Sequence, residues 1–132
     1  MKSTRSILET LEVRQLFLID GLGAVVTAVM LGAVLTTFEP TFGMPQRILL
    51  PLSAVASIFA AYSLTCRARG AGAGYLRAIA LANTAYCLCT LALVVSLRGT
   101  LTWLGVAYFL GEIAIIAALV TVEILVARRA RG

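Results

Sequence analysis

Three long stretches of this 132-residue chain contain no charged residue, and they constrain its fold more than any other feature. The uncharged stretches cover residues 21–38, 48–66 and 78–97. A helix of about this length crosses the ~30 Å hydrocarbon core of a bilayer. A fourth apolar run extends over residues 101–127 and is interrupted only by Glu112 and Glu123. The pattern therefore predicts four membrane-spanning helices.

The composition supports the same fold class. Hydrophobic residues make up 61% of the chain, against roughly 45–50% in soluble domains. We predict an all-α integral membrane protein, a single domain over residues 1–132 that forms a compact bundle of four transmembrane helices. The expected spans cover residues 16–38, 46–66, 76–97 and 101–127. Residues 3–14 have the pattern of a short amphipathic helix, which we expect to lie in the membrane interface.

Basic residues are distributed unevenly between the two ends of these spans. Nine of the eleven precede span one, lie between spans two and three, or follow span four, and the other two are Arg47 and Arg98. Loops rich in lysine and arginine stay in the cytoplasm, so we predict that both termini are cytoplasmic in a bacterial inner (plasma) membrane. The basic clusters are expected to contact lipid head groups, and we expect no nucleic-acid partner.

The residue types of most catalytic and metal sites are missing. The chain has no histidine, and its three cysteines, Cys66, Cys87 and Cys89, form no CxxC motif. Cys87 and Cys89 point in different directions on a helix because they are two residues apart. We find no serine–acid arrangement that could activate a nucleophile. The sequence therefore predicts a protein that is not an enzyme and that holds no metal or cofactor, although tyrosine and carboxylate chemistry on a lipid stays an alternative.

Glu112 is the most informative residue, because it places a carboxyl group deep inside span four. If the span begins near Leu101, Glu112 lies about 16 Å along it, close to the bilayer midplane. An ionised carboxylate there costs at least ~2.5–3.5 kcal/mol, so we expect Glu112 to be protonated unless a cation or water reaches it. The expected hydrogen-bond partners are hydroxyl groups, those of Thr27, Ser57, Thr90 and Tyr108.

Further polar residues are predicted to lie near the cytoplasmic side, at similar depths on four different spans. These residues are Asp20, Tyr62, Asn83 and Glu123. Helical spacing puts Tyr108, Glu112 and Glu123 on one face of span four. If these polar faces point inward, they form a pocket that is open toward the cytoplasm and has Glu112 at its floor. The predicted site for an ion or substrate therefore comprises Glu112, Asp20, Asn83, Glu123, Tyr108 and Tyr62.

Two functions compete. Ionisable residues inside a membrane mark ion and substrate pathways, which favours a transport or channel protein for a proton, a cation or a small polar substrate. A bundle of this size has little room for a pathway, so we expect a homo-oligomer. The alternative is a lipid-binding, assembly or regulatory subunit, whose partner membrane protein packs on small residues such as Ala107 and Gly111 or Ala114 and Ala118.

Overall fold

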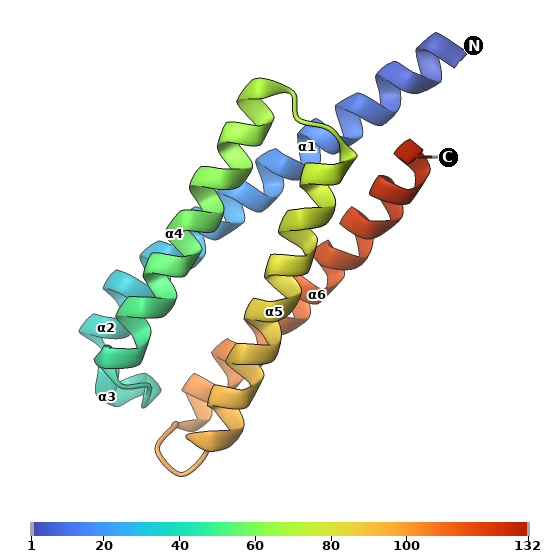
Figure 1. Cartoon of the computed structure of the whole chain (residues 1–132). Helices are drawn as coiled ribbons and strands as arrows, with labels where there is room; N and C mark the ends of the chain where they lie inside the picture. Colours follow the sequence, from blue (N-terminus) through green and yellow to red (C-terminus); the bar gives the residue numbers. More distant parts are fainter. Residues whose placement is uncertain (1, 132) are drawn as a thin grey trace.

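The computed structural model describes the backbone of residues 2–131 and the side chains of residues 13–129. Over this part of the chain all regular secondary structure is helical and there is no strand (Figure 1). The elements are α1 (Lys2–Val29), the π-helical turn η1 (Met30–Val34), α2 (Leu35–Thr37), α3 (Glu39–Phe42), α4 (Gln46–Arg69), α5 (Ala73–Ser96) and α6 (Trp103–Arg131).

Four helical segments are long and apolar enough to cross a membrane, as the uncharged stretches predict. They are Val13–Thr37, Gln46–Arg69, Ala73–Ser96 and Trp103–Arg129. Their bounds differ from the predicted spans by a few residues, and they indicate a multi-pass membrane protein. The amphipathic segment 3–14 is continuous with α1, but the side chains of residues 1–12 lie outside the described ones, and its place in the interface stays a prediction.

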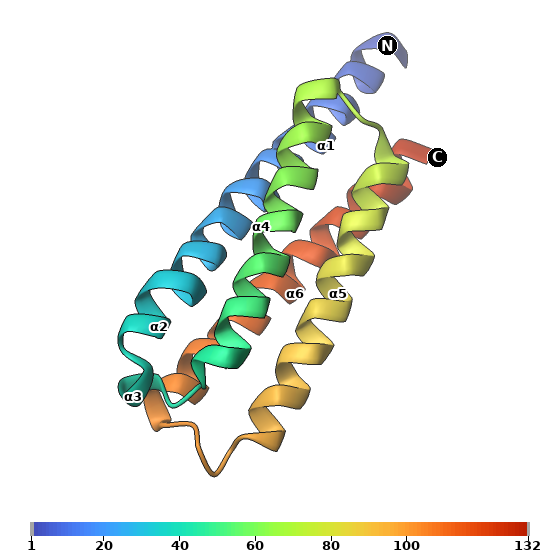
Figure 2. The same cartoon turned by 60° about the vertical axis from the view of Figure 1, so that its left-hand side comes forward.

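The four long helices run antiparallel to their chain neighbours (Figures 1 and 2). Both termini and the short turn between α4 and α5 lie at one end of the bundle, which we call the terminal end. The opposite end carries α3 and the loop before α6.

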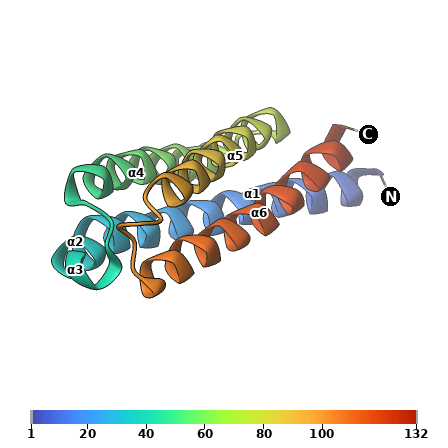
Figure 3. The ribbon, with the colours of Figure 1, turned by 90° about the horizontal axis from the view of Figure 1, so that it is seen from below.

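The bundle consists of two tightly packed helix pairs, α1 with α4 and α5 with α6, which meet each other less extensively. Figure 3 shows the four long helices from below, as one bundle. Glycines allow the close approach within the first pair, because a side chain at Gly21 would overlap Leu64 and one at Gly32 would overlap Ser53. Ser53 Oγ also donates a hydrogen bond of 2.7 Å to the carbonyl oxygen of Ala28. Close backbone contact through small residues is a main source of helix association in lipid.

Two buried hydrophobic clusters occupy the two ends of the bundle. The cluster toward the opposite end includes Leu31, Leu49 and Phe109. The cluster at the terminal end includes Phe17 and Leu76. Most of the buried polar side chains lie between these apolar regions, and this arrangement positions the site described next.

Candidate functional site

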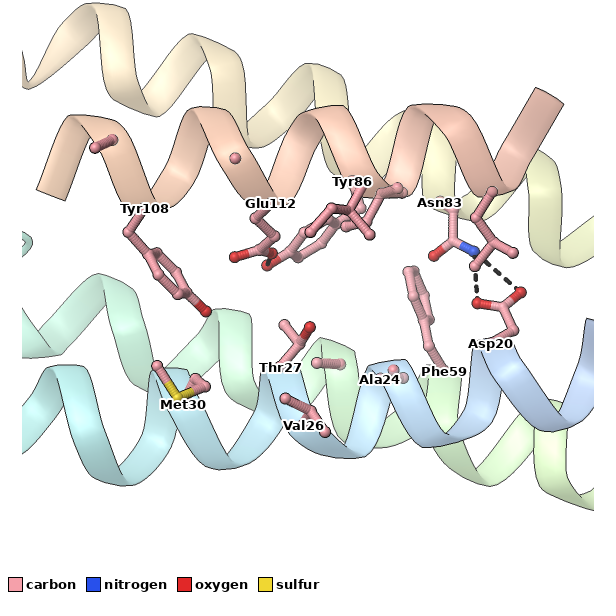
Figure 4. Close-up of a pocket in the computed structure, with 17 residues that line it drawn as sticks. Asp20, Ala24, Val26, Thr27, Met30, Phe59, Asn83, Tyr86, Tyr108 and Glu112 are labelled. Carbon is pink, nitrogen blue, oxygen red and sulfur yellow. Dashed lines mark hydrogen bonds between the residues drawn. The ribbon is translucent and has the colours of Figure 1, made fainter. Parts of the chain in front are cut away.

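A cavity of about 590 Å³ lies between the two helix pairs (Figure 4). Pockets that hold small molecules have volumes of roughly 300–1,000 Å³. The lining comes from α1, η1, α4, α5 and α6, and consists of Asp20, Gly23, Ala24, Val26, Thr27, Met30, Ala56, Phe59, Asn83, Tyr86, Ala107, Tyr108, Gly111, Glu112, Ile115, Ile116 and Leu119. Met30 is the first residue of the π-helical turn η1, a distortion that often occurs at functional sites.

Glu112 projects from α6 into the space that faces α1 (Figure 4). Its side chain is only 9% exposed. Tyr86 on α5 donates its hydroxyl hydrogen to Oε1 of Glu112 over 2.7 Å. Oε2 is buried and has no hydrogen-bond partner among the described residues. Because buried polar atoms normally have a partner, this oxygen is available to a ligand in the cavity.

Tyr86 was not among the predicted partners of Glu112. Ser57 instead donates to the carbonyl oxygen of Ser53 in its own helix. The hydroxyl oxygen of Thr90 is buried without a partner in the described part of the chain, while Thr27 and Tyr108 line the cavity. The sequence does contain a signal for Tyr86. Tyr86 and Glu112 are about equally far from the tight turn at residues 97–102, and residues at equal distances from such a turn lie opposite each other on antiparallel neighbouring helices.

A second polar group lies nearer the terminal end of the cavity. Asn83 on α5 donates from Nδ2 to both carboxyl oxygens of Asp20 on α1, at 3.0 and 3.3 Å. This contact links the two helix pairs (Figure 4). Glu123 of α6 lies beside these two residues and is completely buried. Neither of its carboxyl oxygens has a partner among residues 13–129. The structure therefore brings together three of the predicted site residues.

The remaining two predicted residues have different locations. Tyr108 lines the cavity one helical turn from Glu112. Tyr62 does not line it, and its hydroxyl donates instead to the carbonyl oxygen of Tyr75 over 2.9 Å. That bond fastens α4 to the first turn of α5, outside the cavity.

The cavity is apolar apart from a few acidic, amide and hydroxyl groups. No lysine or arginine in the described part of the chain lines it, so Glu112 has no permanent ion-pair partner there. Nor does any group of three or more His, Cys, Asp or Glu side chains within residues 13–129 have the arrangement of a metal site. The electrostatic character of the cavity therefore comes from its carboxyl groups.

The cavity opens sideways, between α1 and α6. Val26 on α1 is 61% exposed and Ile115 on α6 is 73% exposed, and both line the cavity. The lining glycines Gly23 and Gly111 are also exposed. At the terminal end, buried Phe17 and its neighbours close the bundle. The exposed lining residues therefore lie on the side of the bundle, where lipid would lie, and the predicted opening toward the cytoplasm stays a prediction.

No protein-family model, curated protein or solved structure matches the chain.

Proposed function

We propose that this chain is a small transport protein that exchanges a proton for a cation or a small polar substrate at Glu112. The observation that carries the proposal is the buried Oε2 of Glu112, which has no hydrogen-bond partner within residues 13–129 and faces a cavity large enough for a small molecule. Carboxyl groups at such depth are costly and mark ion or substrate pathways. Catalysis has no part in this proposal.

The exchange follows from the energetics of a carboxyl group in hydrocarbon. In the empty cavity a proton neutralises Glu112, because an ionised carboxylate without a partner is strongly disfavoured there. An arriving cation supplies the missing positive charge, so the proton can leave. Proton and cation then occupy the same carboxyl group in turn, which couples their movements.

The setting of this transporter is also part of the proposal. Nine basic residues lie at the terminal end and two at the opposite end, and by the positive-inside rule this distribution supports cytoplasmic termini in a bacterial inner membrane. Lipids contact the outer faces of the bundle. A homo-oligomer completes the pathway, because one bundle of this size offers little room for it.

Proton release from proteoliposomes tests the proposal. Vesicles with an acidic interior and an internal pH-sensitive dye receive Na⁺, K⁺, choline or tetraphenylphosphonium on the outside. We expect at least one of these cations to drive proton efflux above that of protein-free vesicles. Glu112→Gln removes the efflux, because glutamine cannot exchange a proton, yet it still accepts the hydrogen bond from Tyr86.

Glu39→Gln is the matched control. Glu39 lies in α3 at the opposite end, where its Oε1 accepts a hydrogen bond from the backbone N–H of Gln46, and glutamine keeps that acceptor. This variant is expected to transport at the wild-type rate. Efflux that persists in Glu112→Gln, or its absence with every cation in the wild type, would overturn the proposal.

One observation favours the alternative of a non-catalytic lipid-binding, assembly or regulatory subunit. Four small residues of α6 form an exposed ridge, namely Ala107, Gly111, Ala114 and Ala118. Such ridges admit a partner helix in lipid. Native mass spectrometry of the protein, released gently from its membrane, separates the two functions: a stoichiometric foreign subunit supports the alternative, and copies of this chain alone support the transporter.

A further inference from the structure

The geometry points to an amphipathic organic cation as the substrate class of this cavity, entering it sideways from the bilayer between α1 and α6. This inference rests on the proposed function and makes it more specific. It combines three observations, which are the apolar and aromatic lining, the Glu112 carboxyl oxygen that has no partner within residues 13–129, and the lateral opening.

The lining favours a substrate with a large apolar body. Phe59, Tyr86 and Tyr108 bring three aromatic rings to the cavity, and the ring centroids of Phe59 and Tyr86 are 6.2 Å apart in an edge-to-face arrangement. Aromatic faces attract organic cations and are the usual recognition elements for quaternary ammonium groups. The aliphatic residues that complete the lining would contact the hydrocarbon part of the same molecule.

The available oxygen ligands do not suit a small inorganic cation. Hard cations such as Ca²⁺ and Mg²⁺ need about six or more oxygen ligands, from protein or water. At Glu112 one carboxyl oxygen is already bonded to Tyr86, and both oxygens of Asp20 are bonded to Asn83. An organic cation has a diffuse charge and needs only one carboxylate with aromatic faces nearby.

The position of the opening defines the access route. Gly23 and Gly111 border it from α1 and α6, and the space beside each of them is empty within 4 Å of an added Cβ. Val26 and Ile115 present apolar surface at the same level. An amphipathic molecule partitions into the bilayer, so this opening lies where the molecule is most concentrated.

Binding proceeds with a balanced exchange of charge. The O–H bond of Glu112 breaks, the proton passes to water, and the carboxylate pairs with the cation. The other titratable groups that face Glu112 are the hydroxyls of Tyr86 and Tyr108 and the thiol of Cys87. Of the lining residues that α1 and α4 supply near Glu112, Thr27 and Phe59 are not titratable. One proton is therefore released for each cation bound.

Two ions of nearly the same shape and opposite charge test the substrate class. Tetraphenylphosphonium and tetraphenylborate are each equilibrated with the full chain in lipid nanodiscs, and empty nanodiscs are used to subtract partitioning into lipid. We expect saturable binding of tetraphenylphosphonium, with release of one proton, and no saturable binding of tetraphenylborate. In Glu112→Gln the affinity for tetraphenylphosphonium falls by about tenfold or more.

Gly111→Leu tests the lateral route. The leucine occupies empty space beside the opening and is expected to slow association severalfold. Ala117→Leu is the matched control, because Ala117 is exposed on the same helix but does not line the cavity, and its association rate stays at the wild-type value. Equal binding of the two ions, or unchanged affinity in Glu112→Gln, overturns the substrate class. An unchanged association rate in Gly111→Leu overturns the lateral route.

The outcomes also separate this inference from the proposed function. If Na⁺ or K⁺ drives proton efflux through Glu112 while tetraphenylphosphonium does not bind, the substrate class is wrong and transport stands. If tetraphenylphosphonium binds through Glu112 but no cation drives efflux, the substrate class stands and the chain is a binding protein.

Discussion

The hydrogen bond between Tyr86 and Glu112 allows a quantitative test of the site. We consider Tyr86→Phe, Glu112→Leu and the double variant. Each single change leaves one polar group buried without its partner, because Tyr86 and Glu112 are both nearly inaccessible. The double variant removes both groups. We therefore expect the double variant to be more stable than the sum of the two single effects predicts.

The size of this coupling follows from the geometry. The donor–acceptor distance of 2.7 Å is near the optimum for an O–H···O bond. Hydrogen bonds between side chains in a membrane protein contribute ~0.6 kcal/mol on average and ~1.7 kcal/mol at most. Because both ends are buried, we expect a coupling energy of about 1–1.7 kcal/mol. Each single variant should lose about 1–3 kcal/mol, the cost of an unsatisfied buried group.

Unfolding of the four proteins by denaturant in mixed detergent–lipid micelles measures these free energies. The difference between the double variant and the sum of the single variants gives the coupling energy directly. Additivity within ~0.3–0.5 kcal/mol is typical of residues that do not interact. Such a result would show that Tyr86 does not hold Glu112, and the reasoning about its single available oxygen would fail.

Two further changes test the packing of the bundle and its polar layer. Gly105→Ala should lower the unfolding free energy by about 1–3 kcal/mol, because the added methyl group would overlap the backbone of α3. Gly111→Ala should leave the unfolding free energy unchanged, because the space beside Gly111 is open. Equal effects of the two changes in the same unfolding assay would refute the described packing. Asn83→Leu should destabilise the protein by about 1–3 kcal/mol, because Asp20 loses its hydrogen-bond donor. Adding Asp20→Leu to this variant should restore part of the lost unfolding free energy. If none is restored, the two residues are not partners.

The number and the approximate bounds of the spans follow from the sequence because hydrocarbon excludes unpaired charge. The uncharged stretches 21–38, 48–66 and 78–97 each match, to within one residue at their ends, part of a helical segment that is long enough to cross a membrane. This signal depends on composition alone, so it does not require knowledge of how the helices pack. The grouping of Asp20 with Asn83 follows from the same reasoning, because depth along antiparallel spans can be counted from their ends.

The rotation of each helix could not be predicted. Apolar residues surround these spans on all sides, so no hydrophobic face indicates which direction is inward. For this reason Tyr62, at the right depth, lies outside the cavity, while Tyr86 takes the hydrogen bond that was expected from other hydroxyl groups. The π-helical turn at Met30–Val34 has no recognisable sequence signal either, since its packing partner Ser53 is far away in the chain.

The division of the bundle into two helix pairs has a consequence for how the protein is made. Each pair consists of consecutive spans, α1 with α4 and α5 with α6, and the chain passes from one pair to the other through the short turn at residues 70–72. The first pair can therefore insert into the membrane as a complete helical hairpin before the second has left the ribosome. Two polypeptides cut at this turn would each retain most of their own packing partners. Their reassembly would depend on the two hydrophobic clusters, which draw residues from both pairs, and on the polar contact between Asp20 and Asn83.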